Sequence, residues 1–171
     1  MLDATTQPRE RLPFGAYMDG FTAARDRFVS QHDRESLEET FPPLFEVLNW
    51  ATAIDLRITQ RWRADPPFRG HWPGWYTGGD VLLGTRYARN RVHHQWADAV
   101  DMAFSGSAAE RSASGFVWRW LTSAQLPPGR DDKFRDRYDA DLAGHVVTDT
   151  LQRLSCCFSE AADHLGLDHA P

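Results

Sequence analysis

A run of arginine, asparagine and histidine near the middle of the chain has the residue types for chemistry on a phosphate. Arg89-Asn90-Arg91-Val92-His93-His94 follows Arg86, and no acidic residue lies between Val81 and Gln95. Histidine titrates near neutral pH and can take up or release a proton. Arginine keeps its charge and can hold phosphate oxygens through paired donors. Such groups could activate an RNA 2′-hydroxyl against the adjacent phosphate without a metal ion, leaving a 2′,3′-cyclic phosphate and a 5′-hydroxyl.

The spacing of apolar residues predicts one amphipathic helix over residues 81–104. Its apolar stripe recurs every three or four positions, at Val81, Thr85, Ala88, Val92, Trp96, Ala99 and Ala103. Asn90 and His94 fall on the opposite side with Arg86, His93 lies beside them, and Arg89 sits at the border. These side chains could form no more than a solvated face, but a face made only for solubility would usually mix charges of both signs. We therefore expect the polar face to point to solvent or to a partner.

The motif resembles that of the HEPN superfamily, whose all-helical members include metal-independent ribonucleases. In that family an arginine is followed, four to six residues on, by a histidine, and the residue after the arginine is often asparagine. Arg89, Asn90 and His94 match this form. The resemblance implies an endoribonuclease site assembled at a homodimer interface from two such helices. It further implies that Arg89 stabilises the scissile phosphate, His94 acts as acid or base, and Asn90 positions the phosphate or ribose.

Three neighbouring side chains, Arg86, Arg91 and His93, are expected to bind the RNA substrate. Arg86 and His93 also fit the motif spacing, but Tyr87 follows Arg86 where a polar residue is expected, so this pair ranks second. The family also implies a toxin or defence role and an antitoxin or other regulatory protein as partner. Trp96 stands where related toxins carry a tyrosine that their antitoxin modifies, so that route of regulation is not expected.

Two alternatives remain open beside the ribonuclease. One is a catalytically inactive HEPN-like dimer that binds RNA, a nucleotide or a protein partner through the same face. The other is a helical scaffold subunit. The motif alone does not decide, because the family contains inactive members.

The charge distribution bears on an RNA substrate. The chain has 171 residues and a net charge of −5, which taken alone disfavours nucleic-acid binding. Residues 57–94 nevertheless carry seven arginines against two acids, Asp65 and Asp80. This stretch is either a basic patch of the kind that binds polyanions or a chance clustering on solvated helix faces.

No cofactor or metal ion is expected. The seven histidines do not form a His-Glu-x-x-His pattern, and the two cysteines, Cys156 and Cys157, are adjacent instead of at zinc-ligand spacing. No phosphate-binding glycine loop is present. The aromatic residues of the loop at 65–80, namely Phe68, Trp72, Trp75 and Tyr76, could stack on RNA bases. Packing is the more common role of such residues, and the same holds for Trp118 and Trp120.

The pattern along the chain predicts an all-α bundle of four or five helices with a short non-helical insert. Residues 1–15 read as a flexible arm and residues 16–171 as one HEPN-like domain. The expected elements are helices at 16–31, from Pro42-Pro43 to about 62, 81–104, 132–143 and 146–165, with an extended segment at 116–121. No signal sequence or membrane span is evident, so we expect a cytoplasmic protein.

Overall fold

A computed structural model describes residues 12–30, 36–64, 76, 78–95, 98–104, 116–129 and 132–167. Its elements, in chain order, are α1 (Phe14–Ser30), α2 (Leu37–Ala64), α3 (Gly79–Gln95), β1 (Val100–Phe104), β2 (Phe116–Trp120), α4 (Arg135–Asp141) and α5 (Val147–Leu165). The expected helical bundle is confirmed, and the non-helical insert is an antiparallel hairpin.

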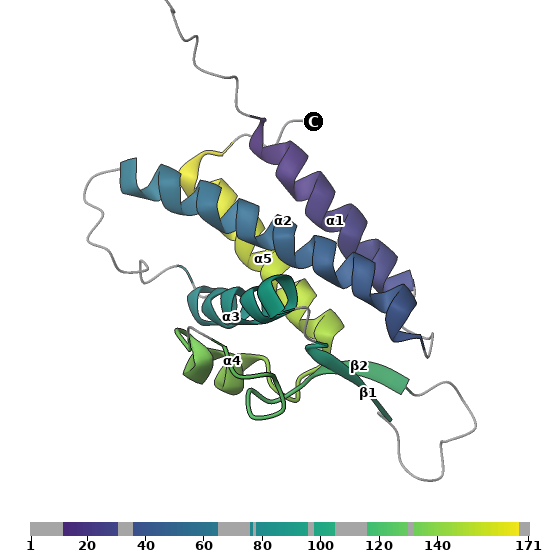
Figure 1. The fold of residues 1–171 in the computed structure, drawn as a ribbon. Coiled ribbons are helices and arrows are strands. Elements are labelled where there is room, and N and C mark those ends of the chain that lie inside the picture. Colours follow the sequence, from purple (N-terminus) through teal and green to yellow (C-terminus); the bar gives the residue numbers. More distant parts are fainter. Residues whose placement is uncertain are drawn as a thin grey trace, which may run out of the picture.

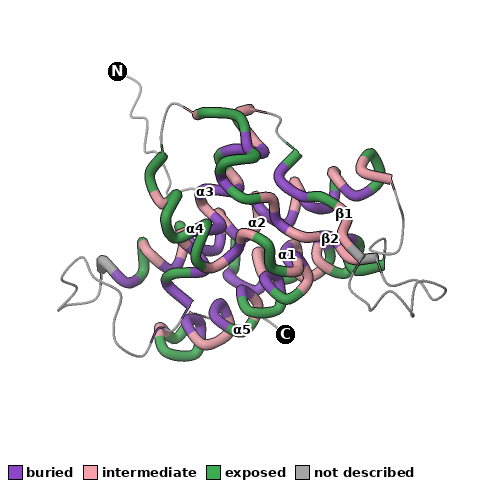
Figure 2. Tube along the Cα trace, turned by 90° about the horizontal axis from the view of Figure 1, so that it is seen from below, coloured by how far each residue is buried: buried purple, intermediate pink, exposed green. Residues whose placement is uncertain are grey.

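Three long helices make the main core. Figure 1 shows α1 lying along α2, with α5 crossing behind them, and each helix buries one side and exposes the other (Figure 2). The ring of Phe21 meets that of Phe158 edge-on, with centroids 5.4 Å apart, and both rings are fully buried. Helix α1 begins at Phe14, which is itself buried, so it takes in the last two residues of the expected arm. Residues 1–11 lie outside the described part of the chain.

Helix α2 starts earlier than the prolines indicated. The helix begins at Leu37 and contains Pro42 and Pro43 in its second turn. Ser36 caps this end, because its hydroxyl accepts a hydrogen bond from the amide of Glu39 at 3.3 Å. Serine followed three residues later by glutamate is a known helix-start sequence. That signal outweighed the prolines, although each of them lacks the amide hydrogen that would donate to the carbonyl four residues earlier.

Helix α3 is shorter than the expected 81–104, and the prediction for its last part was wrong. It ends at Gln95, and residues 100–104 form β1, which pairs with β2 from Val100 opposite Trp120 to Phe104 opposite Phe116. Ala99 suits a helical stripe, but the β-prone segment at 116–120 needs a neighbouring strand to satisfy its backbone. Trp96 and Ala97 lie outside the described residues.

Three aromatic residues that could have stacked on RNA bases or packed, Tyr76, Trp118 and Trp120, are buried. Trp118 and Trp120 of β2 are buried, and the indole Nε1 of Trp120 donates to Thr150 Oγ1 on α5 at 3.0 Å. Tyr76 is buried with its ring edge-on to Trp62, at 5.9 Å between centroids. The other loop aromatics, at 68, 72 and 75, lie outside the described residues.

The short helix α4 covers the side of α3 that faces away from α2. It spans fewer residues than the expected 132–143 because Phe134 adopts a left-handed backbone conformation (φ 70°) just before it. The hydroxyl of Tyr138 donates to the carbonyl of Leu121 at 2.6 Å, which holds α4 against the end of the hairpin. The ring of Tyr138 also packs against that of Tyr87 on α3, at 4.9 Å between centroids.

The close contact between α3 and α4 generates a stability prediction. A Cβ added at Gly84 would lie 2.6 Å from Leu142 Cδ1 and 3.2 Å from the Cα of Tyr138, and a backbone atom cannot move aside cheaply. Gly84→Val should therefore lower the free energy of unfolding in urea by about 1–3 kcal/mol. Gln152→Val places the same side chain on the exposed face of α5 and should cost less than about 1 kcal/mol. If Gly84→Val costs no more than Gln152→Val, the contact between α3 and α4 does not limit the side chain at position 84.

Candidate functional site

Helix α3 is buried on two flanks, and this decides which of its polar residues reach solvent. The predicted stripe of Val81, Thr85, Ala88 and Val92 is buried, as expected. A second buried row, of Gly84, Tyr87 and Arg91, lies toward α4. The polar face is consequently narrower than the sequence indicated, and Asn90 and His94 are the exposed residues of the motif.

The α2 flank is aligned by a buried ion pair. Asp55 is 4% exposed, and its two oxygens accept hydrogen bonds from Arg86 Nε at 2.5 Å and Nη2 at 2.6 Å. Removing a carboxylate from water costs several kcal/mol unless a cation and its hydrogen bonds compensate. Arg86 supplies both, so its guanidinium holds α2 against α3. Arg86 was predicted to bind the substrate, and the structure places its Nε and Nη2 on Asp55.

One turn further along α3, Arg89 reaches a polar residue of α2. Its Nε lies 3.4 Å from Asn49 Oδ1, and its Nη1 lies 3.5 Å from Asn90 Oδ1. Both are long contacts, so they orient the side chain without consuming much of its donor capacity. Nη2 of Arg89 makes no hydrogen bond to any described residue. Arg89 is half-buried, and its guanidinium remains able to hold an anion.

His93 is held between aromatic and cationic neighbours. Its ring stacks on Phe45 of α2 at 5.1 Å between centroids and 17° between planes. Nδ1 is buried and has no hydrogen-bond partner among the described residues. Burial lowers the pKa of His93 below its ordinary value of 6.5, and the charges of Arg89 and His94 lower it further. His93 therefore favours the neutral form, whereas His94 beside it is exposed, with the two rings edge-on at 5.1 Å.

Arg91 points to the other flank of α3 and takes no part in this surface. Its side chain is 3% exposed, forms an ion pair with Asp132, and lies 4.5 Å above the ring of Tyr87. Arg91, which the sequence predicted to bind the substrate, therefore lies apart from Asn90, because the two side chains leave the helix on different sides. Residues 89, 90, 93 and 94 form what we call the α2–α3 edge, together with Phe45 and Asn49.

The α2 residues of this edge were not identified from the sequence. Phe45, Asn49, Thr52 and Leu56 recur three or four positions apart, so they share one face of α2. Leu56 is 56% exposed, which is high for a leucine in a helix that otherwise packs on two sides. The available signal in the sequence was Asp55, an acid directly after Ile54 of the apolar stripe of α2. An acid in that position indicates that a cation from another element pairs with α2.

The basic stretch at 57–94 does not gather into one patch among the arginines that the structure describes. The guanidinium of Arg57 lies over the ring of Tyr17 on α1, at 5.7 Å. Arg61 Nε donates to the carbonyl of Leu165 at the end of α5. With Arg86 and Arg91 in ion pairs, Arg89 is the member of the set that lies on the α2–α3 edge. Residues 65–75, with Arg69 among them, lie outside the described part of the chain.

Comparisons of the chain with models of known families, with curated proteins and with solved structures found no match. In the described residues, no cluster of three or more histidine, cysteine, aspartate or glutamate side chains is placed to hold a metal ion. None of the described helices combines the length and apolar character needed to cross a membrane. Cys156 is exposed and Cys157 buried on α5, and both are free thiols.

The environment of His93 generates a prediction about pH. Its imidazole should titrate below pH 6.5 in an NMR titration, because burial and the neighbouring cation disfavour protonation. Arg89→Gln removes that cation and should raise the midpoint, while the remote Arg153→Gln should leave it unchanged. Since the folded chain prefers neutral His93, protonation favours unfolding. The stabilising contribution is complete above pH 6.5 and is lost as the pH falls from there through the lowered pKa. A wild-type midpoint at or above 6.5 would show that neither burial nor the cation acts on this ring.

Proposed function

We propose that the protein is a metal-independent endoribonuclease of the HEPN type. The observation that carries the proposal is the sorting of the arginines on α3. Arg86 and Arg91 are withdrawn into ion pairs, while Arg89, Asn90 and His94 remain together on the α2–α3 edge. These three are the residues that match the family motif. RNA is abundant in the cytoplasm, which we propose as the site of action.

The chemistry assigned to the edge is an internal transesterification. His94 accepts the proton of a ribose 2′-hydroxyl. The 2′-oxygen bonds to the adjacent phosphorus, and the bond from phosphorus to the 5′-oxygen breaks after that oxygen receives a proton. Arg89 donates to the non-bridging oxygens as negative charge develops on them. The products are a 2′,3′-cyclic phosphate and a 5′-hydroxyl, with no change in net protons.

This reaction uses one group that accepts a proton and one that donates a proton. A single chain offers one exposed imidazole on the edge, because His93 is stacked on Phe45 and its Nδ1 is buried. A second copy related by a two-fold axis brings a second His94 to the same cleft, since such an axis places equivalent residues near one another. Leu56 lies on the same face of α2 as Phe45 and Asn49 and supplies exposed apolar surface for that contact. We therefore propose a homodimer with the α2–α3 edges facing each other.

The chemical prediction uses a matched pair of exposed histidines. Purified protein in excess EDTA should cleave single-stranded RNA and leave cyclic phosphate ends. His94→Ala should abolish cleavage, whereas His164→Ala, on the exposed side of α5, should cleave as the wild type does. Arg89→Ala should lower the rate on the order of a hundredfold or more, since it removes charge stabilisation from the transition state. If His94→Ala keeps full activity, or if only added divalent metal yields activity, the ribonuclease proposal is wrong. RNA binding without cleavage would favour the inactive HEPN-like dimer.

The assembly prediction uses a matched pair of exposed leucines. Sedimentation at micromolar concentration should show a dimer. Leu56→Glu should shift it toward monomer and reduce cleavage together with dimerisation, because a charge would be placed in the apolar contact. Leu12 lies two residues before α1 and is 57% exposed, against 56% for Leu56. Leu12→Glu should therefore have no effect. A wild-type protein that sediments only as monomer, yet cleaves RNA, would refute the composite site.

A further inference from the structure

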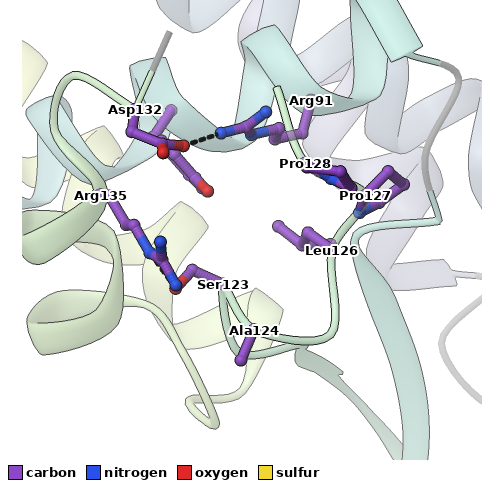
Figure 3. Close-up of a pocket in the computed structure, with 9 residues that line it drawn as sticks. Arg91, Ser123, Ala124, Leu126, Pro127, Pro128, Asp132 and Arg135 are labelled. Carbon is purple, nitrogen blue, oxygen red and sulfur yellow. Dashed lines mark hydrogen bonds and ion pairs between the residues drawn. The ribbon is translucent and has the colours of Figure 1, made fainter. Parts of the chain in front are cut away.

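A second candidate site lies on the other flank of α3. A cavity of about 230 Å³ opens between α3, the segment at 122–129 and the start of α4. Figure 3 shows Arg91 and Asp132 at one end of the hollow, Arg135 and Ser123 at the other, and Leu126 with Pro127 along one side. The cavity does not involve the α2–α3 edge, so binding there does not depend on the proposed ribonuclease activity.

One end of the cavity is rigid. The guanidinium of Arg91 lies on the ring of Tyr87 and forms an ion pair with Asp132. A Cβ at Gly129 would lie 1.3 Å from Arg91 Nη1, so the guanidinium rests directly on the backbone of this loop. Gln95 Nε2 also donates to the carbonyl of Pro128 at 3.1 Å. These contacts fix the loop to α3 and hold the cavity wall in place.

Hydrogen-bond donors face the cavity without matching acceptors. Tyr87 is 2% exposed, and its hydroxyl has no hydrogen-bond partner among the described residues. Arg135 donates through Nε to Ser123 Oγ at 2.8 Å, while its two terminal nitrogens bond to no described residue. Ser123 Oγ donates in turn to Asp139 at 2.5 Å. The side chain of Arg135 is 45% exposed, so an acceptor that enters the cavity can reach its terminal nitrogens.

The charges and the apolar wall define what would complete it. Asp132 pairs with Arg91, and Asp139 accepts a hydrogen bond from Ser123 and lies 4.0 Å from Arg135 Nε, so the nearby acids are already paired. The terminal nitrogens of Arg135 and the hydroxyl of Tyr87 are left for an acceptor. Leu126, which is 6% exposed, and Pro127 form an apolar side opposite these donors. We propose that the cavity binds a small carboxylic acid with an apolar body.

In this complex the carboxylate accepts hydrogen bonds from Arg135 and Tyr87, and the apolar body lies against Leu126. Arginine matches a carboxylate through two parallel hydrogen bonds. The volume holds roughly eight groups of the size of water, at about 30 Å³ each, which suits an acid as small as benzoate. A monoanion fits better than a phosphate dianion, because one guanidinium face is free and the apolar wall offers no donor to further oxygens.

The test is calorimetric titration of the full-length protein with three probes. Sodium benzoate should bind saturably. Benzamide has the same shape without the charge and should bind at least about tenfold more weakly, since a hydrogen bond to a charged group is stronger than one to a neutral group. Inorganic phosphate should bind more weakly than benzoate, because it gains nothing from the apolar wall.

Two arginines of α4 provide the matched variants. Arg135→Gln should weaken benzoate binding about tenfold or more, whereas Arg137→Gln should not, because Arg137 pairs with Asp80 away from the cavity. Tyr87→Phe should weaken benzoate more than benzamide, because the hydroxyl bonds to a charged oxygen in one complex and to a neutral oxygen in the other. A general loss of packing would weaken both alike. The proposal is overturned if benzoate does not bind, if benzamide or phosphate binds as tightly, or if the two arginine variants behave alike.

Discussion

The geometry of the candidate surface depends on a carboxylate that cannot stay buried alone. Asp55 lies in the interface between α2 and α3, and the ion pair with Arg86 sets how far the two helices slide along each other. With that register fixed, Asn49 comes opposite Arg89 and Phe45 comes opposite His93. Breaking a buried pair by removing one partner commonly costs about 3–5 kcal/mol. The arrangement of the α2–α3 edge is therefore tied to the stability of the core beneath it.

Helix α3 divides its polar residues between two environments. The side next to α2 keeps Asn90 and His94 in solvent, while the side next to α4 encloses Arg91 with Tyr87. Neighbouring helical residues diverge by about 100°, so consecutive positions in one motif reach different parts of the molecule. A short run of arginine and histidine can thus serve two sites that share no side chain.

Local patterns in the sequence were enough for the elements but not for the partners of the charged side chains. The burial of Val81, Thr85, Ala88 and Val92 followed from their spacing, and the extended segment at 116–121 from its β-branched and aromatic residues. The fates of Arg86 and Arg91 did not follow, because their acids lie 31 and 41 residues away in the chain. The strand at 100–104 was not predicted for a similar reason. Its residues fit a helical stripe, and only pairing with a distant segment makes them a strand.

At Phe134, the backbone conformation lowers the stability of the fold while the side chain contributes a contact between helices. Its left-handed backbone costs about 1–3 kcal/mol in a residue with a side chain, and glycine would relieve that cost. Yet its ring lies 5.8 Å from the guanidinium of Arg86, the same group that neutralises Asp55, and 4.9 Å from the ammonium of Lys133. The phenyl ring, directly before α4, thus contacts the Arg86 guanidinium that joins α3 to α2. A glycine there would relieve the local backbone strain, but it would also remove the ring that contacts the guanidinium of Arg86. Phe134 therefore costs the fold some stability while it helps to hold α2, α3 and α4 together.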